Sequence, residues 1–185
     1  RVRSHTVAER YGMIFMYRDQ AGGSPDYGLP AMEDFVESEF ESPAKYEFSI
    51  HIHPQDIMEN SVDSAHFRAV HGHSTAVNQF RVEGKELRIT QRLTMRRFFT
   101  QVTGHLEFHM IEPGFHYVHF PRILGNMRAV VFSSIVPIDD QRTNHRLSIW
   151  VSKAPVLGVS RLLRRLIVAD MMRTYHEDMQ IWESK

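Results

Sequence analysis

The feature that most limits the possible folds is a run of strand-like segments followed by one long helical pattern. Val, Ile, Phe, Tyr and Thr concentrate in these segments, and Gly, Pro and Asp separate them, as is typical of strands and turns. Val159–Glu183 then predicts a single helix. Strands that precede a long helix, rather than alternate with helices, indicate an α+β domain with an antiparallel sheet. The expected strands are Tyr46–His53, Val77–Val82, Glu86–Met95, Thr100–Ile111, Phe115–Pro121, Met127–Val136 and Arg146–Val151.

The beginning of the chain has a different pattern. Thr6–Tyr17 is rich in Val, Tyr, Ile and Phe and predicts either a pair of strands or one long strand. Ala21–Pro30 contains a Gly-Gly-Ser-Pro run and is expected to be a loop or linker. The chain starts at Arg1 rather than at Met and ends at Lys185 directly after a helical pattern, so we expect a fragment of a longer protein.

Net charge and cysteine content exclude several classes of function. Acidic residues and Lys plus Arg number 22 each, so no basic footprint points to nucleic acid or to an anionic membrane. The absence of cysteine excludes disulfides, thiolate zinc sites and iron–sulfur clusters within this sequence, and it fits a cytoplasmic location. Leu162–Met172, the best candidate for a membrane span, carries charges and is shorter than the roughly 20 apolar residues required.

Twelve histidines are many for this length and point to metal chemistry. Asn60, Asp63 and His66 lie at i, i+3 and i+6 of an expected helix from Gln55 to about Val70, so they should share roughly one face. His71 lies five residues after His66, about 140° around an ideal helix, so the two imidazoles converge only if the chain unwinds between them. The next residue is a glycine, which permits this. The zinc-protease pattern, with histidines four apart on an unbroken helix, is therefore excluded.

A third ligand must come from another part of the chain. Two histidines and one carboxylate on one face of Fe(II) leave the other positions open for O₂ and substrate. Asp178 is the preferred carboxylate because it lies on the inward stripe of the last helix, and Glu177 and Asp170 are its competitors. The stripe comprises Leu163, Ile167, Asp170, Thr174, Asp178 and Ile181.

The motif resembles that of a known family. The pattern Asn-x2-Asp-x2-His-x4-His is similar to the iron motif of Rieske oxygenase α subunits, and an aspartate shortly before Trp182 is similar to their third ligand. The residues around the motif resemble most the steroid-acting branch, which includes 3-ketosteroid 9α-hydroxylases and cholesterol 7-desaturases. Val7–Phe15 is similar to the strand region that closes the Rieske domain in these proteins. The residues that fulfil the motif are Asn60, Asp63, His66, His71 and Asp178.

The resemblance implies a fold and a role for each residue. His66, His71 and Asp178 would ligate Fe(II), while Asp63 would carry electrons from a cluster on a neighbouring subunit and Asn60 would sit near the open position. The implied fold is a helix-grip (Bet v1/START-like) domain, in which a curved antiparallel sheet wraps a long C-terminal helix around an apolar cavity. Residues 1–20 would be the end of a truncated Rieske domain with its linker strand, and residues 21–185 the mononuclear-iron catalytic domain.

The resemblance also implies an activity and partners. The enzyme would hydroxylate or desaturate a hydrophobic, steroid-like or aromatic polycyclic substrate as a homotrimer. Electrons would come from NAD(P)H through a reductase, with or without a ferredoxin, and through a Rieske [2Fe–2S] cluster. That cluster must lie outside this chain, which has no cysteine.

Two other classes remain open at this point. A zinc-dependent hydrolase can use two histidines and one carboxylate, and a helix-grip module can bind lipid without catalysis. Neither needs an acid at position 63, so Asp63 favours the oxygenase.

Overall fold

The computed structural model describes residues 4–19, 21–25, 28–29, 31–32, 35–97, 100–111, 114–154 and 158–184. Side chains are described for all of these except 75–78, 95–97 and 100–102. The chain divides into two compact units, residues 1–38 and 39–185.

The first unit contains a two-stranded antiparallel hairpin. Strands β1 (Val7–Arg10) and β2 (Met13–Met16) pair in register from Val7–Met16 to Arg10–Met13. The two residues between them, Tyr11 and Gly12, both have positive φ angles of 56° and 67°, as a tight two-residue hairpin turn requires. The structure thus has a strand pair, and not one long strand, in Thr6–Tyr17. Residues 20, 26, 27 and 30, in or beside the predicted linker, lie outside the described residues.

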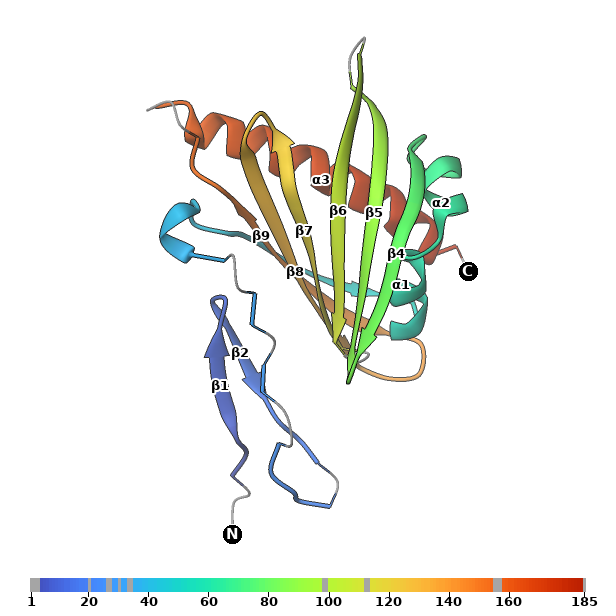
Figure 1. Ribbon diagram of the computed structural model, residues 1–185. Helices are drawn as coiled ribbons and strands as arrows, with labels where there is room; N and C mark the ends of the chain where they lie inside the picture. The colour runs from blue at the N-terminus through green and yellow to red at the C-terminus, as the bar shows by residue number, and fades with distance from the viewer. Residues whose placement is uncertain are drawn as a thin grey trace. The chain divides into compact units, whose positions relative to one another are not determined.

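The second unit is built on a seven-stranded antiparallel sheet (Figure 1). From β5 to β9 each strand pairs with the one before it in the chain, and β3 completes the sheet beside β9. All seven strands expected from the sequence are confirmed, and no further strand joins this sheet among the described residues. In sheet order the strands are β3 (Ala44–Ile50), β9 (Thr143–Val151), β8 (Met127–Pro137), β7 (Phe115–Leu124), β6 (Thr100–Ile111), β5 (Glu86–Arg97) and β4 (Ser74–Glu83).

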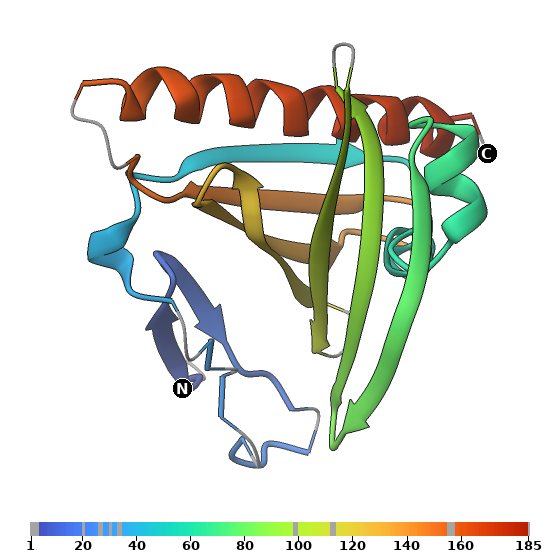
Figure 2. The same cartoon turned by 45° about the horizontal axis from the view of Figure 1, so that its top comes forward.

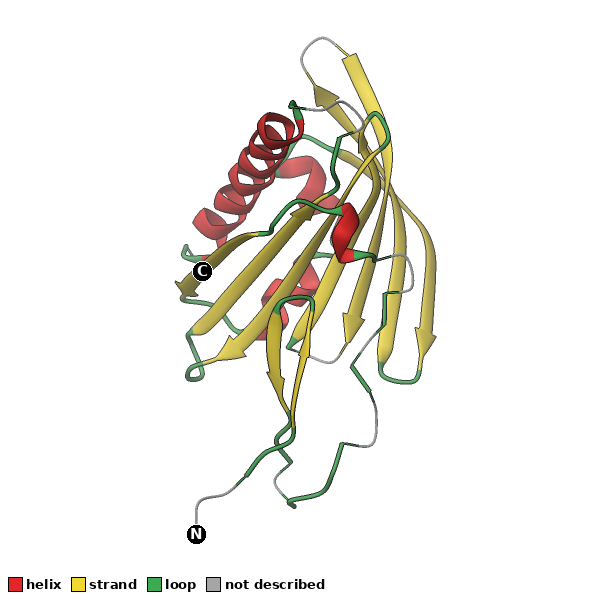
Figure 3. Cartoon of the chain, turned by 90° about the vertical axis from the view of Figure 1, so that its left-hand side faces the viewer, coloured by secondary structure: helices red, strands yellow, loops and turns green. Residues whose placement is uncertain are grey.

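The three α-helices of the described part of the chain lie on one face of this sheet (Figure 3). After a 3₁₀ turn, η1 (Glu37–Glu39), and strand β3, the short helices α1 (Pro54–Asn60) and α2 (Ser64–Ala69) carry the chain from one edge of the sheet to the other. The long helix α3 (Ser160–Trp182) then crosses the sheet (Figure 2). None of the helices described is long and apolar enough to cross a membrane.

Apolar contacts hold α3 on the sheet. Ile167, Val168 and Met172 form one cluster with Leu147, Ile149 and other residues of β8 and β9. Trp182, at the other end of α3, packs with apolar residues of β3, α1 and β8. Burying each large apolar side chain contributes about 1.5–3 kcal/mol, so these clusters fix the position of α3. The inward stripe predicted from Leu163 to Ile181 is confirmed in part: Leu163 and Ile167 pack in the first cluster, whereas Val168, Met172 and Trp182, which lie outside that stripe, are buried as well.

The single helix predicted over Gln55–Val70 is wrong, because the chain breaks between α1 and α2. Asp63 lies outside helical conformation and caps α2, since its Oδ1 accepts hydrogen bonds from the backbone N–H groups of Ala65 (2.8 Å) and His66 (3.2 Å). The buried Gln91 of β5 donates from Nε2 to the carbonyl of Ser61 at 3.1 Å. Asn60, Asp63 and His66 consequently do not share one helix face.

Replacing Ile167 by Ala should lower the free energy of unfolding by about 2–5 kcal/mol, because this side chain is 1% exposed between α3 and the sheet. Its neighbour Leu166 is 55% exposed, so Leu166→Ala is the matched control and should change the stability by less than about 0.5 kcal/mol. Urea unfolding of both variants measures this, and equal losses would contradict the packing described.

Candidate metal centre

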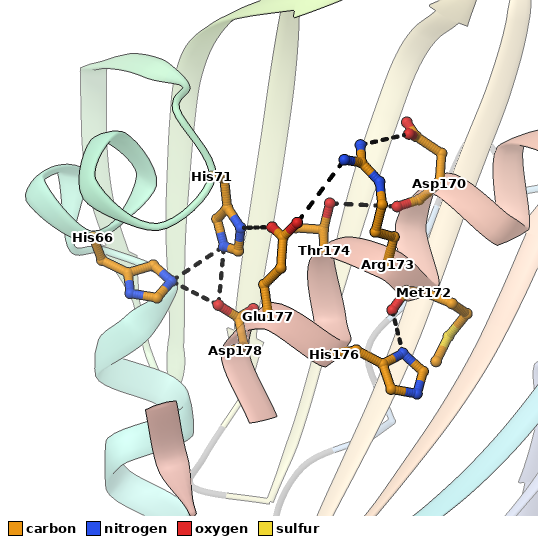
Figure 4. A network of polar contacts seen from close by, with 9 residues as sticks. All are labelled: His66, His71, Asp170, Met172, Arg173, Thr174, His176, Glu177 and Asp178. Atoms are coloured by element: carbon orange, nitrogen blue, oxygen red, sulfur yellow. Dashed lines mark hydrogen bonds and ion pairs between the residues drawn. The ribbon is translucent and has the colours of Figure 1, made fainter. Parts of the chain in front are cut away.

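Two histidines and one aspartate converge where α2 and α3 meet (Figure 4). His66 Nε2 lies 3.2 Å from His71 Nε2 and 2.7 Å from Asp178 Oδ1. His71 Nε2 lies 2.9 Å from the same Asp178 oxygen. The side chains of His66, His71 and Asp178 are only 9%, 2% and 14% exposed, so little water reaches this triangle of donor atoms.

The triangle has the dimensions of one face of an octahedral site. Nitrogen and oxygen ligands about 2.1 Å from a metal and 90° apart lie about 3.0 Å from one another, whereas a tetrahedral arrangement separates them by about 3.4 Å. The three observed separations run from 2.7 to 3.2 Å. The donor set and its spacing therefore fit a divalent metal held on one side only.

The backbone after α2 brings the second histidine to this point. α2 ends at Ala69, Gly72 has a φ of +64°, and the N–H of His73 donates to the carbonyl of Phe67 at 2.9 Å. The chain thus turns sharply at a residue that tolerates this conformation. The unwinding expected between His66 and His71 is confirmed.

A second carboxylate orients His71. Its Nδ1 lies 2.7 Å from Glu177 Oε2, so Nδ1–H donates to that carboxylate and Nε2 is the nitrogen that faces the triangle. Burial lowers the pKa of His71, but hydrogen bonds to Asp178 and Glu177 outweigh it and leave the pKa raised. Of the competing carboxylates, Glu177 is thus a partner of His71, and Asp170 pairs with Arg173 at 3.0 Å (Figure 4).

The other residues singled out in the sequence, Asn60, Asp63 and His176, do not belong to the triangle. Asn60, the last residue of α1, lines the cavity beside the triangle. Asp63 is exposed at the start of α2. His176 is adjacent to Glu177 in sequence, but its Nδ1–H donates to the carbonyl of Met172 at 2.5 Å, and the ring points away from the triangle (Figure 4).

The triangle opens into a cavity of about 230 Å³ between the sheet and the helices. The walls are mainly apolar, with Leu106, Phe108 and Val118 from the sheet and Met171 and Met172 from α3 among the lining residues. An apolar cavity with few polar groups is typical of a site for a hydrophobic small molecule.

The same cavity contains a polar cluster that the sequence does not predict. His145 Nε2 lies 2.5 Å from Ser133 Oγ, and His145 Nδ1 lies 2.6 Å from the hydroxyl of Tyr175. His116 lies on the neighbouring strand, directly opposite Ser133. Burial lowers the pKa of His116 to about 4, and burial together with His116 lowers that of His145 to about 3, so both rings are neutral near pH 7. The sequence gives one signal for part of this cluster. Tyr175 lies three residues before Asp178 on α3, so the two side chains point to a similar side of the helix.

Comparison with known proteins gives both a family and a fold. The family model described as 3-ketosteroid 9alpha-hydroxylase C-terminal domain matches residues 16–185. Among solved structures, Pseudomonas putida CBB5 NdmA is 15% identical, with a TM-score of 0.65 over 98% of this chain and 51% of that one. NdmB from the same organism is 17% identical, with a TM-score of 0.68 over 98% and 52%. Dicamba monooxygenase bound to dicamba is 12% identical, with a TM-score of 0.72 over 98% and 59%.

The chain therefore spans between half and three fifths of the length of these structures. At such identities the likeness shows the fold, an antiparallel sheet with a long C-terminal helix. A comparison with curated proteins finds no match.

The two buried neutral histidines should make the protein less stable in mild acid. Both have a folded-state pKa below the ordinary 6.5, so the unfolded chain binds more protons and stability falls as pH drops from about 6.5 toward 4. Each histidine contributes up to about 1.4 kcal/mol per pH unit. His116→Leu should reduce the loss between pH 7 and pH 5 by about 2 kcal/mol, measured by urea unfolding at both pH values. An unchanged pH dependence would contradict the neutral buried state of His116.

Proposed function

The chain belongs to the 3-ketosteroid 9α-hydroxylase C-terminal domain family of Rieske oxygenase catalytic domains, and we propose that it oxidises a hydrophobic substrate at a mononuclear Fe(II) site. The observation that carries this proposal is the triangle of His66, His71 and Asp178 donor atoms at the edge of an apolar cavity. In this proposal the domain is of the helix-grip type.

The triangle supplies three ligands and leaves the cavity side open. When Fe(II) is bound there, it provides the redox chemistry that activates O₂ for attack on a C–H bond. His66 and His71 bind through Nε2, and Asp178 lowers the net charge of the site. Glu177 holds the His71 ring in orientation through Nδ1, and the surrounding apolar walls exclude water.

The substrate class follows from the cavity and from the relatives. The apolar walls favour a steroid-like or aromatic polycyclic molecule, and the family description names a ketosteroid hydroxylase. The similar structures were solved with caffeine for NdmA and with dicamba for dicamba monooxygenase, so this fold accepts compact ring systems as well. Hydroxylation or desaturation of such a substrate is the proposed reaction.

Electrons must enter from outside the chain, because no cysteine is present to hold a Rieske [2Fe–2S] cluster. We assign their entry to Asp63, whose exposed carboxylate lies at the start of the helix that carries His66. In a cytoplasmic homotrimer a neighbouring subunit would present its cluster at this point, supplied by NAD(P)H through a reductase or ferredoxin. Residues 1–20 would then be the end of the Rieske domain.

The chain should bind about one Fe(II) after anaerobic reconstitution, and His66→Ala and Asp178→Ala should each abolish tight binding. His176→Ala is the matched control and should retain iron, because His176 lies on α3, as Asp178 does, but outside the triangle. Metal content after desalting measures this. Retention of iron by all three variants would refute the site, and zinc retained in place of iron, with O₂-independent hydrolysis, would favour a hydrolase.

Glu177→Ala should weaken Fe(II) affinity by about 10–100-fold without removing a ligand, because His71 loses the acceptor that orients it. Glu183→Ala, at the end of α3, is the control and should leave the affinity unchanged. Competition with a chelator under anaerobic conditions measures both affinities, and equal values would show that Glu177 does not position His71.

Asp63→Asn should separate the electron route from the structural cap. The amide oxygen still caps α2, so stability and iron content should stay near those of the wild type. Turnover of the complete oxygenase with its reductase should fall by at least about tenfold, because the carboxylate is lost. Asp63→Ala should lose turnover and also about 1 kcal/mol of stability. Full turnover in Asp63→Asn would show that Asp63 only caps α2 and does not carry electrons.

A further inference from the structure

A compact polar cluster interrupts the apolar wall of the cavity. It consists of His116 on β7, Ser133 on β8, His145 on β9 and Tyr175 on α3, all of which line the cavity. The three strands are adjacent in the sheet, and Ser133 pairs with His116 across β7 and β8. His116, Ser133 and His145 are 6%, 1% and 2% exposed, so bulk water does not satisfy them.

The cluster has more hydrogen-bond donors than contacts. A neutral His145 has one N–H, and Ser133 and Tyr175 each have one O–H, which makes three donors. Only two contacts join these groups, Ser133 to Nε2 and Tyr175 to Nδ1. In either tautomer of His145, one hydroxyl hydrogen of Ser133 or Tyr175 therefore has no acceptor within the cluster and is available to a ligand in the cavity.

His116 adds a second donor. Its Nδ1 is enclosed and has no hydrogen-bond partner among the described residues. An enclosed N–H without a partner is rarer than an enclosed lone pair, so the proton stands on Nε2. The His116 ring lies in the cavity wall, and its centroid is 6.4 Å from that of His145. The N–H of His116 and the hydroxyl donor beside His145 therefore face the same part of the cavity.

The cluster lies beside the turn of α3 that carries Asp178. His145 contacts the rings of Tyr175 and Trp182, which lie three residues before and four residues after Asp178. Residues three apart on a helix have Cβ atoms about 5–6 Å apart, so the side chains of Tyr175 and Asp178 are neighbours on α3 and the cluster adjoins the metal triangle. A ligand held there is fixed at one end while another part of it faces the triangle.

We propose that His116, Ser133, His145 and Tyr175 form a binding site for the carbonyl oxygen of an otherwise hydrophobic ketone. A carbonyl oxygen has two lone pairs and no hydrogen, which matches two donors and fills the unmet hydrogen bonds. The same contact sets which carbon of the ligand faces the triangle. That the ketone is the substrate rests on the proposed function.

The test uses the full chain and three bicyclic probes of matched shape: decalone, decalol and decalin. Decalol and decalin are transparent where tryptophan is excited and decalone absorbs only weakly there, and Trp182 lines the cavity, so its fluorescence reports binding. His116→Leu and Ser133→Val should each weaken decalone binding about threefold to tenfold, and the double variant more, with decalin binding unchanged. His116→Gln restores a donor and should recover part of the affinity.

Ser148→Val is the matched control, because Ser148 is equally buried on β9 but is not among the residues that line the cavity. An infrared spectrum provides a measurement that needs no variant. The carbonyl band of decalone bound to the wild type should lie below its position in hexane.

The proposal is overturned if the wild type does not bind decalone, if the band stays at its hexane position, or if the variants bind decalone as the wild type does. Tighter binding of decalol than of decalone would show that the cluster prefers a hydroxyl group, and it would overturn the assignment of a carbonyl oxygen as the bound group. Since the probes bind without metal or turnover, loss of the iron site with intact decalone binding would refute the oxygenase and leave this site standing.

Discussion

The packing of α3 on the sheet is the interaction on which the cavity and the candidate metal centre both depend. Apolar residues in two clusters along α3 anchor it, and Thr174, Tyr175 and Asp178, which lie between these clusters, line the cavity. Asp178 thereby meets two histidines that precede it by more than a hundred residues in the chain. A shift of α3 by one residue would rotate its face by about 100° and remove the carboxylate from the triangle.

The segment between β3 and β4 supplies the other half of the centre through irregular backbone. One continuous helix would hold His66 and His71 apart, whereas a capped short helix that ends at a glycine turn brings them together. Asp63 and Gln91 stabilise the start of this segment, and Glu177 fixes the orientation of the ring at its end. Three candidate ligand atoms are therefore held together by the protein alone, which would lower the cost of organising a metal site.

Much of the fold and of the candidate site could be predicted because the signals are local. Strand composition and turn residues identified all seven strands of the large sheet, and helical spacing placed Asp178 inward. The break between α1 and α2 could not be predicted from helical periodicity, which continues through Ser61, and the carbonyl of Ser61 is bound by Gln91 of β5, far away in the sequence. The cluster of His145, Ser133 and Tyr175 depends on the strand register and on the position of α3 on the sheet. Neither can be read from a short segment of the sequence.

The most direct test of this account is a crystal structure of the chain grown anaerobically with Fe(II), with anomalous data collected at the iron edge. One iron should lie about 2.1 Å from Nε2 of His66, Nε2 of His71 and an Asp178 oxygen. Glu177 should remain on Nδ1 of His71, and the cavity side should have no protein ligand. Iron bound elsewhere, or a fourth side chain that closes the site, would contradict the account.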